Sequence, residues 1–128
     1  MLRHQGPPRR VVITGIGCVT PIGTGRTAFW DALIAGKSGG RRIESFDVSD
    51  SAAKIAAFVP DFDWEAELSA KDKKHVPRTV PLALSAARQA MADAGIDTAD
   101  MSLDERRTIG VEIGTGGGGL AFAEKHYE

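Results

Sequence analysis

The sequence has one cysteine in 128 residues, no long apolar run and no excess of charge of either sign. A single cysteine excludes an internal disulfide, and the cysteine and histidine spacing of a zinc site is missing. We therefore expect a reducing, cytoplasmic compartment, no metal and no cofactor. No stretch reaches the length of a membrane span. Sixteen basic residues against seventeen acidic ones leave a formal charge of −1, which argues against nucleic acid as a partner.

Residues 1–9 are predicted to be a flexible leader. Arg3, His4, Arg9 and Arg10 precede an apolar run, as they would in a signal peptide. Glycine and proline interrupt that run, however, and no small-residue cleavage pattern follows it. We expect residues 10–128 to form one partial domain.

Two segments have the composition of β-strands that are covered on both faces. Residues 11–13 are all β-branched and lead into a glycine-rich turn, and residues 108–113 lead into four consecutive glycines. This pattern is typical of strands that leave the centre of an α/β sheet through tight loops. Glu112 lies within the second segment, where a carboxylate is unfavourable unless it is paired or lies at a sheet edge.

Two helices are predicted, each with a glycine at its end. After Thr24, the expected N-cap, apolar residues at helical spacing between positions 29 and 34 predict a helix that Gly36 ends. Residues 80–94 predict a second helix, with Pro81 in its first turn and Gly95 at its end. The second helix is rich in alanine, which indicates close packing on several sides.

The remaining segments carry weaker patterns. We expect 38–50 to form a surface loop, 54–59 a short strand, 61–68 a brief helix with acidic caps, 96–107 a polar connector and 121–128 the start of another helix. The carboxylates of Asp61, Asp63, Glu65 and Glu67 are interpreted as helix caps that face solvent, with metal binding or acid–base chemistry as the alternative.

A nucleotide-binding α/β domain is a further alternative, although its motifs are incomplete. Residues 36–38 read Gly-Lys-Ser, like the end of a phosphate-binding loop, but Asp31 stands where the first glycine of that loop belongs. In the turn after the first predicted strand, Thr20 replaces the third glycine of a dinucleotide-binding fingerprint. A helix end followed by a loop is the favoured interpretation of the first motif.

Taken in order, these segments resemble the N-terminal portion of a β-ketoacyl-acyl carrier protein synthase of the elongating type. The resemblance covers nearly everything from Arg9 to Leu120, and it implies an α/β, thiolase-like fold, of which this chain is the N-terminal part of the first βαβαβ layer only. The matching segments are 10–17, 20–23, 29–39, 46–47 and 61–63, the alanine-rich helix up to Gly95, and 110–119.

The resemblance implies a 3-oxoacyl-[acyl-carrier-protein] synthase, which joins acyl and malonyl thioesters by decarboxylative Claisen condensation in fatty acid or polyketide biosynthesis. It also implies acyl carrier protein thioesters as partners and a homodimer at full length. The family's nucleophilic cysteine and two histidines lie downstream of the matched region, so we expect no catalytic residue in this chain and no activity from it alone. Cys18 is instead interpreted as a buried small hydrophobe, and His4, His75 and His126 match no catalytic histidine.

A non-catalytic partner subunit, such as a chain-length factor, is the alternative from a different class, because it shares the fold and lacks the nucleophile. In either case, strands that complete the family's sheet lie outside these 128 residues. Residues 108–113 would then keep an unpaired edge. We therefore expect the isolated chain to be partly folded or prone to aggregate.

Gly116, Gly117 and Gly118 form the candidate acyl-pocket site that the resemblance implies. A bulky aliphatic residue commonly stands in the family at the place of Gly117 and gates the pocket. Its absence predicts either a more open acyl pocket or merely a permissive loop. Members also carry a Met-Asp-Arg-Phe-like segment before the long helix, of which residues 76–79 keep only Arg78.

Overall fold

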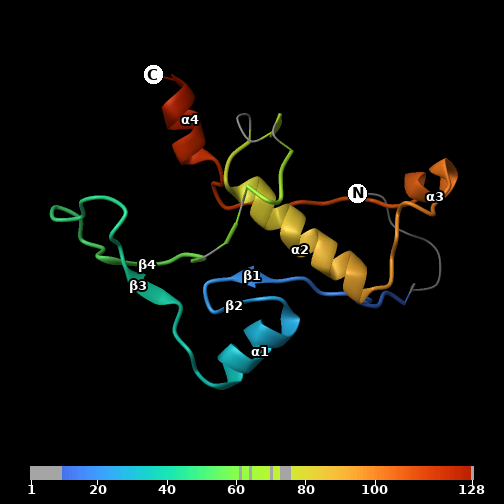
Figure 1. Cartoon of the computed structure of the whole chain (residues 1–128), viewed down its shortest axis with the longest axis horizontal. Helices are drawn as coiled ribbons and strands as arrows, with labels where there is room; N and C mark the ends of the chain where they lie inside the picture. The colour runs from blue at the N-terminus through green and yellow to red at the C-terminus, as the bar shows by residue number, and fades with distance from the viewer. Residues whose placement is uncertain (1–9, 61, 64, 70, 73–75, 128) are drawn as a thin grey trace, which may run out of the picture.

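In the computed structural model, helix α2 (Thr79–Asp93) runs through the middle of the molecule, and the other elements are arranged around it (Figure 1). The structure describes residues 10–60, 62, 63, 65–69, 71, 72 and 76–127. The other elements, in chain order, are β1 (Val19–Thr20), β2 (Gly23–Thr24), α1 (Arg26–Ile34), β3 (Gly40–Arg42), β4 (Ile55–Ala57), α3 (Leu103–Arg107) and α4 (Leu120–Tyr127).

The strands form two separate antiparallel pairs, β1 with β2 and β3 with β4. In the first pair Thr20 lies opposite Gly23, and in the second Arg41 lies opposite Ala56. The hydroxyl of Thr20 holds the turn between β1 and β2. It donates a hydrogen bond to the carbonyl of Gly23 at 2.8 Å and accepts one from the N–H of Gly23 at 3.2 Å. Each pair is a local hairpin or ribbon rather than part of a larger sheet.

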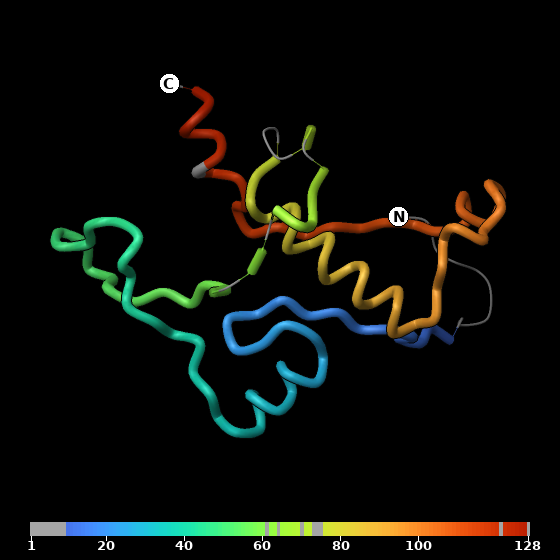
Figure 2. Tube along the Cα trace, viewed as in Figure 1, coloured from blue at the N-terminus to red at the C-terminus, as the bar shows by residue number. Residues whose placement is uncertain are grey.

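The two expected central strands are not formed in the described part of the chain. Residues 11–13 and 108–113 run as drawn-out segments (Figure 2), and Val11 and Val111 are 90% and 84% exposed. A strand needs a ladder of hydrogen bonds to a neighbour, and no described segment supplies one to either stretch. The prediction of covered strands is therefore wrong for this chain by itself, and Glu112 is exposed rather than covered.

The glycines after the first of these segments lie in close contact with α2. A Cβ atom added at Gly15 would stand 2.1 Å from the carbonyl oxygen of Ala90, and one at Gly17 would stand 1.9 Å from that of Ala86. Backbones approach this closely only where no side chain separates them. The small residues of both partners thus allow the segment to pass directly across the helix (Figure 2).

Polar side chains of α2 also hold this segment. The carboxylate of Asp93 accepts a hydrogen bond from the N–H of Ile16 at 3.0 Å, and the side-chain oxygen of Gln89 accepts one from the N–H of Cys18 at 3.1 Å. Asp93 also forms an ion pair with Arg26 at the start of α1, at 3.0 Å. Two backbone donors that a sheet would normally satisfy are therefore satisfied by a helix.

Helix α1 begins one residue later than its sequence predicts. Gly25, with φ of 89°, is the N-cap, and Thr24 belongs to β2. The predicted end is confirmed: Gly36 has φ of 66°, and the N–H of Lys37 donates to the carbonyl of Ala32 at 2.9 Å. This is the left-handed glycine ending that satisfies the last free carbonyls of a helix.

The alanine-rich helix is confirmed within one residue at each end. Gly95 has φ of 68°, and the N–H of Ile96 donates to the carbonyl of Met91 at 2.9 Å, so α2 ends in the same way as α1. Pro81 lies in the first turn, as expected, and its side chain is fully buried.

Of the weaker patterns, two are confirmed and two need correction. The 54–59 segment contains β4, and the 121–128 segment contains most of α4. The expected surface loop 38–50 contains β3, because its backbone pairs with β4. The expected connector 96–107 contains α3, which a capping box starts: Ser102 and Glu105 each accept a hydrogen bond from the other's backbone N–H.

The brief acidic helix is not present among the described residues, since Asp61 and Trp64 lie outside them and the rest of that stretch forms turns. The carboxylate of Asp63 accepts hydrogen bonds from the N–H groups of Glu65 and Ala66, at 3.2 and 3.1 Å. Asp63 therefore caps a turn rather than a helix.

The chain buries little of its own surface. Its accessible area is 10952 Å², whereas a compact monomer of this mass would expose about 6,600 Å². Among the described residues only Ala32, Pro81 and Ser85 are buried. No helix in the described ranges is long and apolar enough to cross a membrane.

Candidate functional site

The predicted acyl-pocket residues form a turn between the drawn-out segment 108–113 and α4. The N–H of Gly118 donates to the hydroxyl of Thr115 at 3.0 Å. Gly117 and Gly119 have φ angles of 108° and 98°, which residues with a side chain rarely adopt. The turn therefore contains one internal hydrogen bond and two backbone conformations that favour glycine.

This turn lies against the start of α2. A Cβ atom added at Gly118 would stand 2.7 Å from the hydroxyl oxygen of Thr115 and 3.1 Å from the methyl group of Thr79. One added at Gly119 would stand 3.7 Å from Pro77, whereas Gly116 has nothing within 4 Å. The three predicted site residues therefore differ. Gly118 contacts Thr79 and Thr115, Gly117 has a positive φ that favours glycine, and Gly116 borders open space.

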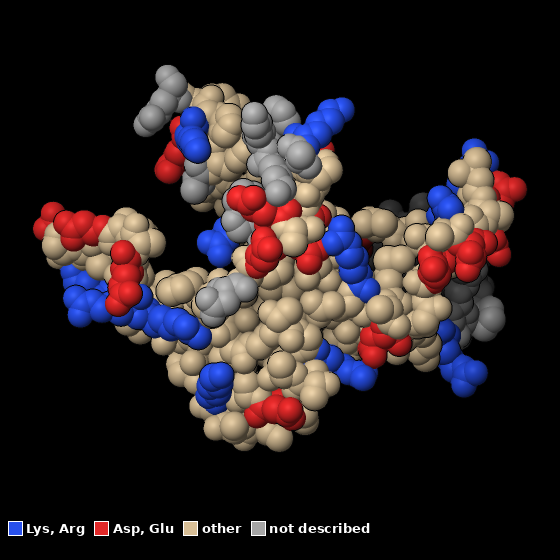
Figure 3. Space-filling model, in the orientation of Figure 1, with Lys and Arg blue, Asp and Glu red and all other residues tan. Residues whose placement is uncertain are grey.

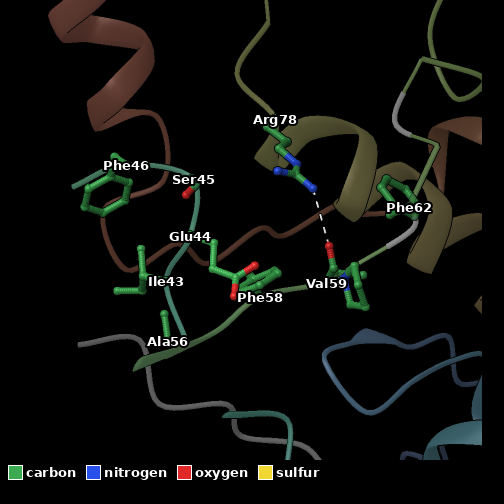
Figure 4. Close-up of a pocket in the computed structure, with 10 residues that line it drawn as sticks. Ile43, Glu44, Ser45, Phe46, Ala56, Phe58, Val59, Phe62 and Arg78 are labelled. Atoms are coloured by element: carbon green, nitrogen blue, oxygen red, sulfur yellow. Dashed lines mark hydrogen bonds between the residues drawn. The ribbon is translucent and has the colours of Figure 1, made fainter. Parts of the chain in front are cut away.

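A second candidate lies beside β3 and β4, where a cavity of about 680 Å³ is lined mainly by apolar side chains (Figure 4). Ile43, Phe46 and Phe58 line it together with Glu44 and Arg78. Arg78 donates a hydrogen bond from Nη2 to the carbonyl of Val59 at 3.4 Å. The sequence predicted only a surface loop for the stretch that contains Ile43 and Phe46, because nothing in their spacing shows that they lie near Phe58.

Cys18 is half-buried and free. Cys18 lines a cavity of about 410 Å³ together with Ile16, Phe29 and Trp30. This cavity lies between α1 and the segment that packs on α2 through Gly15 and Gly17. The prediction of a buried side chain is therefore wrong for Cys18, which is only partly covered and borders this cavity.

The other singled-out side chains are spread over the molecule. Glu67 pairs with Arg88 of α2. His126 stacks on Phe122 in α4, with ring centroids 4.1 Å apart. His4 and His75 lie outside the described residues. Within the described ranges, no three residues of the His, Cys, Asp and Glu types come together to hold a metal ion.

Two exposed carboxyl groups have lowered pKa values, both because of serine. The N–H and hydroxyl of Ser49 donate to Asp47, at 2.9 and 3.0 Å, and lower its pKa. The hydroxyl and N–H of Ser102 donate to Glu105, at 2.7 and 2.8 Å, and lower its pKa. Hydrogen bonds stabilise the charged form in each case. Both carboxylates cap local structure.

The fold places the chain in the class of ketosynthases. A solved structure described as the ishigamide ketosynthase/chain length factor matches it with a TM-score of 0.64 and 38% identity, over 73% of this chain and 23% of that one. The family model of the beta-ketoacyl synthase N-terminal domain matches residues 8–128. The chain therefore belongs to the beta-ketoacyl synthase family, through its N-terminal domain, which confirms the resemblance seen in the sequence.

Two curated proteins similar to this chain are synthases. The 3-oxoacyl-[acyl-carrier-protein] synthase 2 of Coxiella burnetii is 42% identical over 120 residues, which are 94% of this chain and 28% of that protein. The tetracenomycin polyketide synthase ketoacyl synthase alpha subunit of Streptomyces glaucescens is 40% identical over 128 residues, which are 99% of this chain and 29% of that protein. The chain thus spans less than a third of the length of these relatives.

Proposed function

We propose that this chain is the N-terminal portion of a 3-oxoacyl-[acyl-carrier-protein] synthase, which performs decarboxylative Claisen condensation of acyl and malonyl thioesters in fatty acid or polyketide biosynthesis. The family match over residues 8–128 is the observation that carries the proposal. Acyl carrier protein thioesters are the proposed partners, a cytoplasmic homodimer is the proposed working form, and no cofactor is required.

In this proposal the chain supplies scaffold, and the reacting cysteine and two histidines belong to the part of the fold that these residues do not contain. The exposed β-branched side chains of residues 11–13 and 108–113 support this division, because such segments become strands when neighbours pair with them. The first βαβαβ layer of a thiolase-like fold is then completed by further polypeptide. The 128 residues alone have no condensing activity.

The non-catalytic alternative keeps one specific support. The matched solved structure is described as a ketosynthase/chain length factor, so both kinds of subunit occur within one described assembly. A nucleophilic cysteine in the longer polypeptide would favour the enzyme, and its replacement by another residue would favour the chain-length factor.

A hybrid protein tests the proposed function. Residues 8–128 would replace the matching region of the C. burnetii relative, and the hybrid would be supplied with acyl and malonyl thioesters of acyl carrier protein. We expect a 3-oxoacyl product, and we expect none from the 128-residue chain. A hybrid that melts cooperatively like the parent synthase yet forms no product would contradict the proposal.

The turn at Gly116, Gly117 and Gly118 is the proposed wall of the acyl pocket. Because Gly117 has φ of 108°, isoleucine there would strain the turn by about 1–3 kcal/mol, whereas Gly116 borders open space. In the hybrid, we expect Gly116→Ile to shorten the acyl chains accepted and to leave the melting temperature nearly unchanged. Gly117→Ile should change both. Equal product distributions in both variants and the parent hybrid would remove the turn from the pocket.

A further inference from the structure

The cavity beside β3 and β4 is separate from the glycine turn, and the proposed condensation does not use it. Three parts of the chain form it: the loop after β3, the end of β4 and the N-cap position of α2 (Figure 4). Its volume of about 680 Å³ is within the range of about 300–1,000 Å³ that small-molecule sites occupy. The space-filling view shows the molecule indented beside the lobe that carries β3 and β4 (Figure 3).

Aromatic rings provide one part of this cavity. Phe46, in the loop after β3, is 65% exposed, and Phe58, directly after β4, is 43% exposed. Phe62 follows Phe58 in the same segment and also lines the cavity. Rings from two parts of the chain therefore line one space. A hydrocarbon group placed among them would remove apolar surface from water.

A cation provides the other part. The guanidinium of Arg78 has five N–H donors and makes one hydrogen bond to the described residues, to the carbonyl of Val59 at 3.4 Å. The remaining donors suit a carboxylate, which a guanidinium binds through two parallel hydrogen bonds. Arg78 thus offers a charged contact at the margin of an apolar space (Figure 4).

The cavity also contains a negative charge, the carboxylate of Glu44, which allows the sign of the ligand's charge to be tested. Glu44 takes part in no hydrogen bond or ion pair with the described residues. Its carboxylate would repel an anion near Arg78 and would attract a cation. Removal of the charge at Glu44 and at Arg78 must therefore shift the affinity for any charged ligand in opposite directions.

We propose that this cavity binds a small amphipathic carboxylate, with its hydrocarbon part among Phe46, Phe58 and Phe62 and its carboxylate on Arg78. We infer an anion because the guanidinium of Arg78 has several donors without a described partner and can form the two parallel hydrogen bonds that a carboxylate accepts. The site serves a ligand other than the thioester that condenses.

Calorimetric titration of the hybrid synthase that carries residues 8–128 with decanoate tests this proposal. We expect Arg78→Gln to weaken binding about tenfold or more, as loss of a charged hydrogen bond does, and Glu44→Gln to strengthen it about two- to fivefold. Arg107→Gln removes the same charge from α3, away from the cavity, and should change affinity less than about twofold.

Several results would overturn the proposal. Absence of decanoate binding to a hybrid that melts cooperatively would do so, as would equal effects of Arg78→Gln and Arg107→Gln. Tighter binding of decyltrimethylammonium, weakened by Glu44→Gln, would show that the cavity takes a cation. Misfolding does not produce the expected pattern, since Glu44→Gln must increase affinity while Arg78→Gln decreases it.

Discussion

Two stretches of the chain share one sequence pattern and meet different surroundings. A Cβ atom at Gly15 or Gly17 would stand within 2.1 Å of a carbonyl oxygen of α2, whereas one at Gly110 or Gly114 would meet nothing within 4 Å. Both stretches combine β-branched residues with glycine. The first is docked on a helix, and the second has open space beside both of its glycines.

The difference shows what a strand pattern encodes. β-branched residues and glycines prepare a backbone to pair and to pack closely, but the ladder itself needs a partner. The docked stretch finds a partial substitute in Gln89 and Asp93, whose side chains accept hydrogen bonds from its N–H groups. In the undocked stretch, the N–H groups of Thr108 and Ile109 donate to carbonyls of α3, and no acceptor is described for those of residues 110–113, which stay drawn out and exposed.

Gly17→Ala should have the largest effect, because it breaks the docked side of the comparison. Its Cβ would overlap the carbonyl oxygen of Ala86 at 1.9 Å, and overpacking of this kind costs about 3 kcal/mol. We expect the segment to separate from α2. Hydrogen exchange at the amides of Ile16 and Cys18 should accelerate to the rate of a free chain.

Gly114→Ala is the matched control on the undocked side. Gly114 has nothing within 4 Å and is not among the glycines with positive φ, so we expect a change within about 0.5 kcal/mol. The same urea titration of helical circular dichroism would serve both variants. Equal destabilisation by the two alanines would refute the close contact with α2.

Asp93→Ala should have an intermediate effect. It removes the acceptor for the N–H of Ile16 and the partner of Arg26, and a hydrogen bond to a charged group contributes about 1.5–3 kcal/mol. Arg26→Gln keeps the acceptor and loses only an ion pair whose arginine is 62% exposed, which is worth less than about 1 kcal/mol. The urea midpoint should fall further for Asp93→Ala than for Arg26→Gln. Equal midpoints would show that the ion pair, which both variants lose, is the larger contribution.

The smallest expected effect is on α3, which precedes the undocked stretch. A capping box formed by Ser102 and Glu105 stabilises the start of this helix. Hydrogen bonds from the side chain and backbone of Ser102 lower the pKa of Glu105. A lowered pKa means that the cap stabilises α3 above the pKa of an ordinary glutamate and is lost as pH falls through the lowered value. We expect Ser102→Ala to raise the pKa of Glu105 toward the ordinary value, measured from its carboxyl carbon shift. An unchanged titration would exclude the capping box.

Local features were predictable from the sequence, and longer-range ones were not. The glycine endings at Gly36 and Gly95 depend on residues within five positions, so both helix ends were predicted correctly. The sequence did not predict β3, because Arg41 pairs with Ala56, fifteen residues away. The polar composition of 38–50 gives no sign of this pairing. In the candidate site, glycine at 117 was evident, but the contact of Gly118 with Thr79 joins residues 39 positions apart.

The sequence by itself determined α1 and α2 with their glycine endings, the family and the chemistry that family membership leads us to propose, because each of these depends on local residue order. Only the tertiary structure decided that the first glycine-rich stretch rests on α2, that the glycine turn rests on Thr79, and that three phenylalanines and an arginine surround one cavity. Those arrangements depend on which distant surfaces meet, and hydrophobic contact is non-directional, so composition alone does not specify the partner.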